Sequence, residues 1–316
     1  MIDFKPLRLH QKAEYDRLLQ HAGERGCEYS FTNLFLWGRQ MAAFCHDHLV
    51  FFSQFNRRSV YLFPVGSPEP KAALDAVIAD AASRGIPCRL TGLTQDDCAT
   101  LQRLYPGRFR YHFDRDGYDY VYAIDDLADL KGRKFQKKRN HLNRFSQDHP
   151  DCVSVPLDGE NLEAARNMVE QWYKVRIAED PHGEYMLEQI ALDRALRRYD
   201  ALKMGGLMLV DDGEVLAVTM GSRMSPDTMD IHFEKAREDV DGAYAAVNCE
   251  FARYLRMKYP ELKYLNREDD MGLEGLRKAK LSYQPHHFEE KYYAYLMEDV
   301  HDEECAEAAL DGNLRG

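Results

Sequence analysis

The first half of the chain mixes two hydrophobic periods, one typical of helices and one typical of strands. Apolar residues at helical spacing predict helices at 11–22, 30–39, 69–84 and 95–105. Short runs rich in β-branched and aromatic residues predict strands at 42–46, 48–54, 59–63, 88–91, 109–113 and 119–124. Ser30 is placed to cap the second helix, and Pro64 with Gly66 ends the third strand.

The second half repeats this order of elements. The same patterns predict helices at 160–176, 184–199, 243–258 and 272–282. They predict strands at 152–157, 206–211, 214–222, 228–236, 262–266 and 292–297. Helices, a strand meander, a helix, a strand, a helix and closing strands therefore occur twice, which predicts an α+β protein with two similar domains.

We expect four segments along the chain. They are an N-terminal domain (1–130), a basic linker helix (131–150), a C-terminal domain (151–297) and an acidic tail (298–316). The tail carries a block of carboxylates that repel one another, and we assign it no function.

Composition and charge narrow the class of protein. The 45% hydrophobic and 30% charged content of the 316 residues is that of a globular protein. A net charge of −11 argues against a surface that binds nucleic acid indiscriminately, because phosphate neutralisation needs a basic field. The cysteines form no Cys-x-x-Cys pair, and neither a signal peptide nor an apolar run of membrane-spanning length occurs. These features predict a cytoplasmic protein with reduced thiols.

The 12 histidines do not predict a metal site. None lies in a His-x-x-x-His or Cys/His array with ligand spacing, and His286 and His287 point to opposite faces of a strand. We therefore expect no metal and no other cofactor.

The most informative group of polar residues follows the strand predicted at 262–266. Asn266, Arg267, Glu268, Asp269 and Asp270 combine an amide, a guanidinium and carboxylates where apolar residues give way to solvent. Sites in layered α/β folds gather at such strand ends. The alternative is a solvated turn in which Asp270 caps the next helix.

Four stretches together resemble the signatures of one known family. They are residues 29–37 (YSFTNLFLW), 131–145 (KGRKFQKKRNHLNRF), 232–236 (HFEKA) and 265–283 (LNREDDMGLEGLRKAKLSY). The chain resembles the phosphatidylglycerol lysyltransferase C-terminal domain family over roughly residues 20–297.

This resemblance implies two tandem GNAT-like acyltransferase domains, each with a mixed, mostly antiparallel sheet flanked by helices. Named members transfer an aminoacyl group from aminoacyl-tRNA to a membrane lipid, and the related Fem-type transferases use the same kind of donor to extend cell-wall precursors. This sequence contains no multi-span membrane region, which argues against phosphatidylglycerol as the acceptor.

The strand predicted at 228–236 carries the second polar group. Regular alternation puts Asp230, His232 and Glu234 on one face, so that His232 and Glu234 point the same way. Either residue would then serve as a base or bind an aminoacyl ammonium. The polar outer face of an antiparallel sheet has the same alternation, so both interpretations stay open.

In a GNAT-like layout the strand at 262–266 lies beside this one, and its loop reaches Glu234. We expect Arg267 to bind a phosphate or carboxylate, together with Asn266, Arg277 and Lys280. The expected catalytic residues are Glu234, His232, Glu268, Asp269 and Tyr283. By resemblance, Tyr283 lies where GNAT enzymes often have a general-acid tyrosine, and a buried, hydrogen-bonded tyrosine is the alternative.

The loop at 237–243 helps to identify the acyl donor. CoA-dependent GNAT enzymes bind the pyrophosphate there, whereas this chain has carboxylates at 238, 239 and 241 that would repel it. CoA is therefore disfavoured. Asp241 is also placed to cap the following helix.

The segment 131–149 inverts the sign of the charge. Seven basic residues and one acid give it +6. If Phe135, Leu142 and Phe145 pack inward, four basic residues face a polyanion such as a tRNA acceptor stem or anionic headgroups: Lys137, Lys138, Arg139 and Arg144. A basic linker helix neutralised by the rest of the protein is the alternative.

The leading hypothesis is an acyltransferase that moves an aminoacyl group from aminoacyl-tRNA to a lipid, peptide or small-molecule acceptor by direct attack. The alternatives are a CoA-dependent N-acyltransferase and a GNAT-like binding module without catalytic activity. The oligomeric state and the acceptor do not follow from the sequence.

Overall fold

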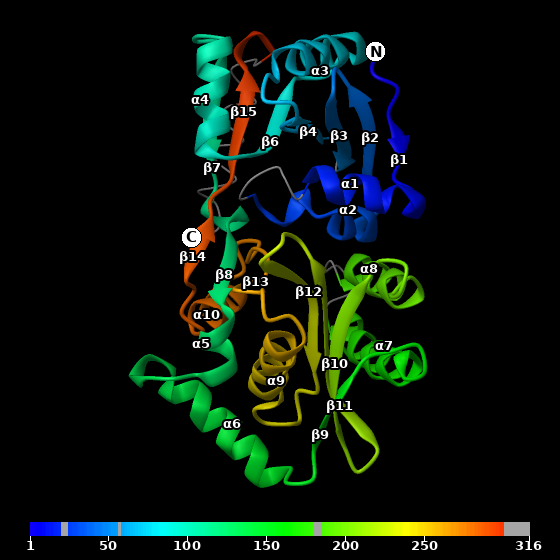
Figure 1. Cartoon of the computed structure of the whole chain (residues 1–316), viewed down its shortest axis with the longest axis vertical. Coiled ribbons are helices and arrows are strands. Elements are labelled where there is room, and N and C mark those ends of the chain that lie inside the picture. The colour runs from blue at the N-terminus through cyan, green and yellow to red at the C-terminus, as the bar shows by residue number, and fades with distance from the viewer. Residues whose placement is uncertain (20–24, 56–57, 180–184, 300–316) are drawn as a thin grey trace. The chain divides into compact units, whose positions relative to one another are not determined.

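The computed structural model describes residues 1–19, 25–55, 58–179 and 185–299. Most of the acidic tail expected at 298–316 thus lies outside the described residues. The chain forms two compact units, one made of Met1–Tyr118 with the chain from Glu289 onward, the other of Asp119–Phe288 (Figure 1).

The first unit is built on a mixed sheet. Its strand order is β1 (Lys5–Pro6), β2 (Gln40–Cys45), β3 (His48–Phe55), β4 (Arg58–Leu62), β6 (Arg89–Leu93), β15 (Tyr292–Leu296) and β7 (Phe109–Phe113), with β5 (Val65–Gly66) on β3. Its helices are α1 (Lys12–Leu19), α2 (Phe31–Trp37), α3 (Lys71–Arg84) and α4 (Gln95–Leu104). The Ser30 side chain accepts a hydrogen bond from the Asn33 amide, as expected of a helix cap.

The second unit contains the other sheet. Its strand order is β14 (His287–Glu289), β8 (Asp119–Ala123), β13 (Tyr264–Asn266), β12 (Thr228–Ala236), β11 (Glu214–Arg223), β10 (Met204–Asp211) and β9 (Val153–Pro156). Its helices are α5 (Ile124–Asp129), α6 (Gln136–Asp148), α7 (Leu162–Glu179), α8 (Tyr185–Arg197), α9 (Ala243–Lys258) and α10 (Glu274–Leu281). The predicted strand at 228–236 and helix at 243–258 agree with β12 and α9 residue for residue.

The boundaries between the units differ from those expected. Strand β8 pairs with β13 in the second sheet, whereas β15 pairs with β6 and β7 in the first. The basic segment is not a separate linker, because Phe135 and Phe145 are buried in cores of the second unit. A local hydrophobic pattern predicts that a strand forms but not which sheet it joins, since pairing partners come from distant residues.

A β-bulge in β12 decides which face of the second sheet each polar residue occupies. Met220 of β11 lies opposite Phe233, but the next residue, Gly221, lies opposite Ile231, so His232 is an extra residue in β12. Before the bulge, Met229 and Ile231 join the core with helix α9. The alternation changes phase at His232.

Two contacts beyond the bulge identify the faces. Glu234 accepts a hydrogen bond from Asn248 of α9, and the next residue, Lys235, donates to Glu188 of α8. Successive strand residues point to opposite faces, so α9 covers one face and α8 the other, with α7 beside α8 (Figure 1). His232 and Glu234 therefore lie on opposite faces, which corrects the expectation that they point the same way.

Gly221 permits this bulge. A Cβ atom at that position would lie 2.3 Å from the Asp230 carbonyl oxygen and 3.2 Å from the Ile231 side chain. A contact of 2.3 Å is shorter than packed atoms allow, so a larger residue fits at position 221 only if the two strands move apart.

We expect Gly221→Ala to lower the free energy of unfolding by about 1–3 kcal/mol, because the added methyl group forces β11 away from β12. Gly205→Ala in the neighbouring strand is the control, since a Cβ there would meet no atom within 4 Å. Urea denaturation of the two variants measures the difference. Equal stability of both variants would contradict the steric role of Gly221.

Candidate functional site

The site lies where β12 and β13 separate. These parallel strands pair only between Thr228–Asp230 and Tyr264–Asn266. Beyond this pairing β12 continues to Ala236, whereas the segment that follows β13 forms a loop at 267–273. The unpaired edge of β12 faces this loop, so polar side chains from both segments meet there.

Lys280 of α10 fixes the first part of the loop. Its ammonium donates to the carbonyl oxygens of Arg267 (2.6 Å), Glu268 (3.2 Å) and Asp269, which uses its three donors. Burial, followed by the charge of Arg267, lowers the pKa of Lys280. Lys280 therefore holds the backbone of the loop, and its expected substrate-binding role stays a prediction.

Asn266 fixes the start of the same loop. Its amide nitrogen donates to Asp119 at 2.9 Å, and its carbonyl oxygen accepts from the Glu268 amide at 2.7 Å. Both ends of this buried side chain are hydrogen-bonded within the protein, and its expected contact with substrate stays a prediction.

A buried carboxylate fixes the end of the loop. Asp270 is completely buried and accepts two hydrogen bonds from Arg277, at 2.8 and 2.7 Å, and one from the Tyr120 hydroxyl. Burial alone would raise the pKa of Asp270, but these hydrogen bonds outweigh it and hold the pKa below its usual value. Arg277 compensates the charge of Asp270, and its expected role in substrate binding stays a prediction. The side chain of Asp269 accepts a hydrogen bond from the Met271 amide in a local turn.

On the α9 face, four side chains form what we call the arginine cluster: Glu234, Asn248, Arg267 and Tyr283. The Arg267 guanidinium donates to Glu234 at 2.8 Å and lies 4.9 Å from the centre of the Tyr283 ring. The other Glu234 oxygen accepts from Asn248 at 3.0 Å. Burial, more than any other factor, raises the pKa of Tyr283, which is protonated at neutral pH.

On the opposite face, four side chains form what we call the histidine cluster: Ser222, Asp230, His232 and Glu268. The Nε2 atom of His232 lies 2.8 Å from the Ser222 hydroxyl oxygen. Its Nδ1 atom lies 3.2 Å from Glu268 and 3.5 Å from Asp230. Glu268 is the most exposed of the charged members, with a side-chain exposure of 21% against 2% for His232 and 0% for Asp230.

These two clusters share one loop. Arg267 and Glu268 are consecutive residues, yet Arg267 contacts β12 from the α9 face and Glu268 contacts it from the other. The positive φ of 56° at Glu268 reverses the chain direction between them. The site thus has a cationic, aromatic side and an acidic side, separated by the edge of β12.

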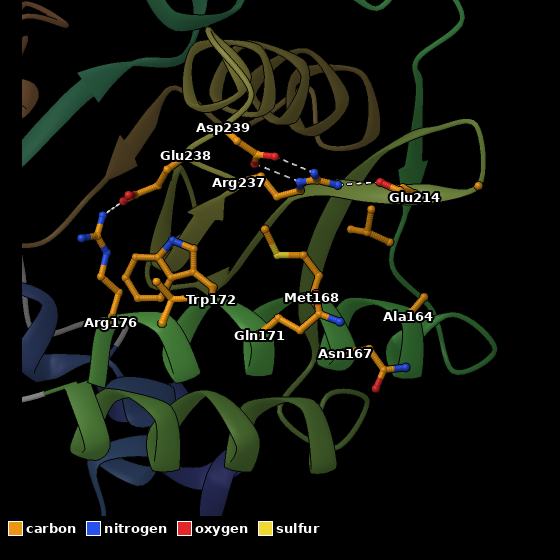
Figure 2. A pocket seen from close by; sticks show the side chains of 13 residues that line it. Ala164, Asn167, Met168, Gln171, Trp172, Arg176, Glu214, Arg237, Glu238 and Asp239 are labelled. Carbon is orange, nitrogen blue, oxygen red and sulfur yellow. Dashed lines mark hydrogen bonds and ion pairs between the residues drawn. The ribbon is translucent and has the colours of Figure 1, made fainter. Parts of the chain in front are cut away.

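In the loop at 237–243, where a CoA pyrophosphate would bind, charged side chains form ion pairs with one another and with neighbouring elements. Figure 2 shows Arg237 between Asp239 and Glu214, and Arg176 of α7 reaching Glu238. They border a cavity of about 680 Å³ whose floor includes Met168 and Trp172. At the start of α9, the Gly242 backbone is so close to α6 that a Cβ would lie 2.5 Å from the His141 carbonyl oxygen. The two arginines of this region are thus already paired with carboxylates, and the Gly242 backbone lies against α6.

The basic residues of α6 that were expected to bind a polyanion differ in their surroundings. Arg144 pairs with Asp241 and Asp148, and Arg139 donates to the carbonyl oxygens of Leu130 and Gly132. Lys138 turns inward over the Tyr283 ring. Of the four residues expected to face a polyanion, Lys137 remains exposed without an ion pair among the described residues.

Sequence reasoning missed three members of the clusters: Ser222, Asp230 and Asn248. No local motif marks Ser222 or Asn248. Asp230 was visible only as one residue of an alternating strand. The absence of ligand spacing also concealed that Asp230, His232 and Glu268 bring potential ligand atoms within 4.8 Å of one another.

Comparison with known proteins identifies the family. The family model for "Phosphatidylglycerol lysyltransferase, C-terminal" matches residues 20–295. The chain belongs to this family of acyltransferases. The family and the tandem GNAT-like α+β fold expected from the sequence are both confirmed. No helix among the described residues has the length and apolar character needed to cross a membrane.

Several individual proteins are similar to this family member. A Bacteroides thetaiotaomicron protein of unknown function is 37% identical, with a TM-score of 0.88 over 94% of this chain and 100% of its own. L-PGS from Bacillus licheniformis is 15% identical, with a TM-score of 0.66 over 96% of each chain, and FemX is 11% identical, with a TM-score of 0.57 over 94% and 98%. These last two show the shared fold.

One curated relative, an uncharacterised Mycoplasmoides gallisepticum protein, is 28% identical over 181 residues. The match spans 55% of this chain and 54% of that protein, so about half the length of the relative is covered.

Replacing Lys280 tests the architecture of the loop. We expect Lys280→Met to lower the free energy of unfolding by about 1–3 kcal/mol, because three carbonyl groups lose a charged donor. Lys278→Met on the same helix is exposed and should change stability by less than about 0.5 kcal/mol. Chemical denaturation measures the free energy of unfolding of both variants. A similar loss of stability in the two would contradict the role of Lys280.

Asp270 gives a pH-dependent test. Because its folded-state pKa lies below the unfolded value of about 3.9, its ionic contribution is present above about pH 4 and is lost as the pH falls further. The destabilisation by Asp270→Asn should therefore be full at pH 7 and shrink below about pH 4. Urea denaturation from pH 3 to 7 measures it, with the exposed turn variant Asp212→Asn as control. A constant difference across this range would refute the prediction.

Proposed function

We propose that the second unit transfers an aminoacyl group from aminoacyl-tRNA to a hydroxyl or amine acceptor by direct attack. The observation that carries this proposal is the position of Arg267 and Glu268 on opposite sides of β12, with the arginine cluster on one side and the histidine cluster on the other. An ester substrate bound at this edge of β12 would meet both.

The acidic side is suited to the aminoacyl group. An aminoacyl ester carries an α-ammonium, and Asp230 and Glu268 offer carboxylate oxygens 3.5 and 3.2 Å from one imidazole nitrogen. Opposite charge favours the ammonium there. Glu268 is the exposed member, so it accepts the proton from the attacking acceptor, while His232 holds its carboxylate in position.

The donor is inferred from charge and from the family. The engaged loop at 237–242 disfavours CoA, because Arg237 and Arg176 are already paired and α6 covers Gly242. L-PGS shares the fold, and its family model matches this chain. Exposed Lys137 of α6 is available for contact with tRNA phosphates. Anionic lipid headgroups remain the other partner that this chemistry would suit.

The chemistry requires no cofactor. Attack of the acceptor on the ester carbonyl breaks the bond to the tRNA ribose, and the acceptor proton moves to Glu268 while the ribose oxygen gains a proton on the other side. Pre-organised charged groups in a partly buried site stabilise the charge that develops.

The test is transfer of label. Wild-type protein is incubated with tRNA charged with ¹⁴C-labelled amino acids, together with a cell lipid extract and small amine acceptors, and the label leaving tRNA is followed. We expect Glu268→Gln to reduce the rate about 10²–10⁴-fold through loss of the base. Glu274→Gln, exposed on α10, is the matched control.

Two results would overturn the proposal. Consumption of labelled acyl-CoA with no release from tRNA would show a CoA-dependent enzyme. A Glu268→Gln variant that binds charged tRNA and transfers label at the wild-type rate would remove Glu268 from the reaction.

A further inference from the structure

Lys138 occupies an unusual place for a residue of a basic helix. It lies in the first turn of α6, and its ammonium nitrogen is 3.6 Å from the centre of the Tyr283 ring. The same ring supports the Arg267 guanidinium at 4.9 Å. Lys138 therefore extends the arginine cluster, whereas its neighbour Lys137 is exposed.

The groups around this ammonium come from every element of the cluster. The nearest are Glu234 of β12, Arg267 of the loop and Tyr283 after α10. Tyr122 of β8 and Cys249 of α9 lie close to Tyr283 and complete the surroundings. Glu234 is engaged by Arg267 and Asn248, so the principal contact of Lys138 is an aromatic face. Burial, and then the charge of Arg267, lowers the pKa of Lys138 to about 8.

We propose that Lys138 is the catalytic acid that protonates the leaving oxygen of the aminoacyl donor. This inference rests on the proposed function. If the aminoacyl ammonium lies in the histidine cluster and the ester lies across the edge of β12, the ribose oxygen points toward the arginine cluster, where Lys138 lies over the Tyr283 ring.

The step balances. The acceptor atom forms a bond to the ester carbonyl carbon and gives its proton to Glu268. The bond between that carbon and the ribose oxygen breaks, and its electron pair takes a proton from the Lys138 ammonium. Solvent then returns a proton to Lys138 and removes one from Glu268.

Tyr283 is the residue that the GNAT resemblance suggested for this task, and its surroundings favour a different role. Burial raises its pKa and makes its hydroxyl a weaker acid than the Lys138 ammonium. Its ring face contacts both cations of the cluster. Tyr283 positions Lys138 and Arg267 by cation–π contact, which requires the ring and not the hydroxyl.

The experiment compares four variants in the charged-tRNA transfer assay across pH 6–10. We expect Lys138→Met to reduce kcat about 10²–10³-fold. Lys138→Arg keeps the charge but does not release a proton, so it should show a similar loss. Lys278→Met, which removes an exposed lysine of α10, is the matched control and should keep the wild-type kcat. Tyr283→Phe retains the ring and should stay within about 2-fold of wild type.

Two further readouts separate a catalytic from a structural role. Wild-type kcat should fall as the pH rises through about 8, because the acid must be protonated. NMR of ¹³C-dimethylated lysines, with the Lys138 signal assigned from the Lys138→Met variant, should show Lys138 titrating near 8.

The outcomes are distinguishable. Absence of transfer from tRNA by the wild-type protein would end both the proposed function and this assignment. Transfer by the wild type with an unchanged rate in Lys138→Met would end the assignment alone. A large loss in Tyr283→Phe with little loss in Lys138→Arg would transfer the acid role to the tyrosine hydroxyl.

Discussion

The extra residue at His232 is the constraint on which the site depends. Because a strand alternates strictly, one inserted residue moves every later side chain to the other face of the sheet. Without it, Glu234 would share a face with His232, away from α9 and Asn248. With it, the sheet separates a cationic, aromatic cluster from an acidic one, while the short loop between Arg267 and Glu268 serves both. Gly221 permits this arrangement because only a hydrogen atom fits against the Asp230 carbonyl group.

Several polar residues of the motif support the loop through hydrogen bonds within the protein. Lys280, Asp270 and Asn266 are each buried, and each uses its polar atoms on backbone or side-chain partners within the second unit. A buried charge is tolerated only with such partners, since its desolvation is costly. These buried hydrogen bonds and ion pairs fix the conformation of the loop, and this conformation holds Arg267 and Glu268 on the two sides of β12.

Charge in this protein is mostly compensated locally. The basic segment gives +6 in the sequence, yet Arg144 pairs with Asp241, Arg139 satisfies the carbonyl groups of a turn, and Lys138 enters the arginine cluster. In the same way, Arg237 and Glu238 face oppositely charged neighbours at the mouth of the cavity in Figure 2. A count of charges along the chain therefore overstates the basic surface that α6 presents.

The sequence by itself determined the main elements and the family. Strand 228–236 and helix 243–258 were readable because hydrophobic periods depend on neighbouring residues, whereas the functional role of residues 266–270 stays a prediction. The tertiary structure decided which sheet each of β8 and β15 joins and where the bulge at His232 lies. It also decided which residues of the 265–283 motif are buried within the loop and which contact β12. It also turned Lys138 from a surface cation into part of the site and brought Ser222 to His232. Each of these depends on strand register and side-chain packing between residues far apart in the chain, which no local pattern encodes.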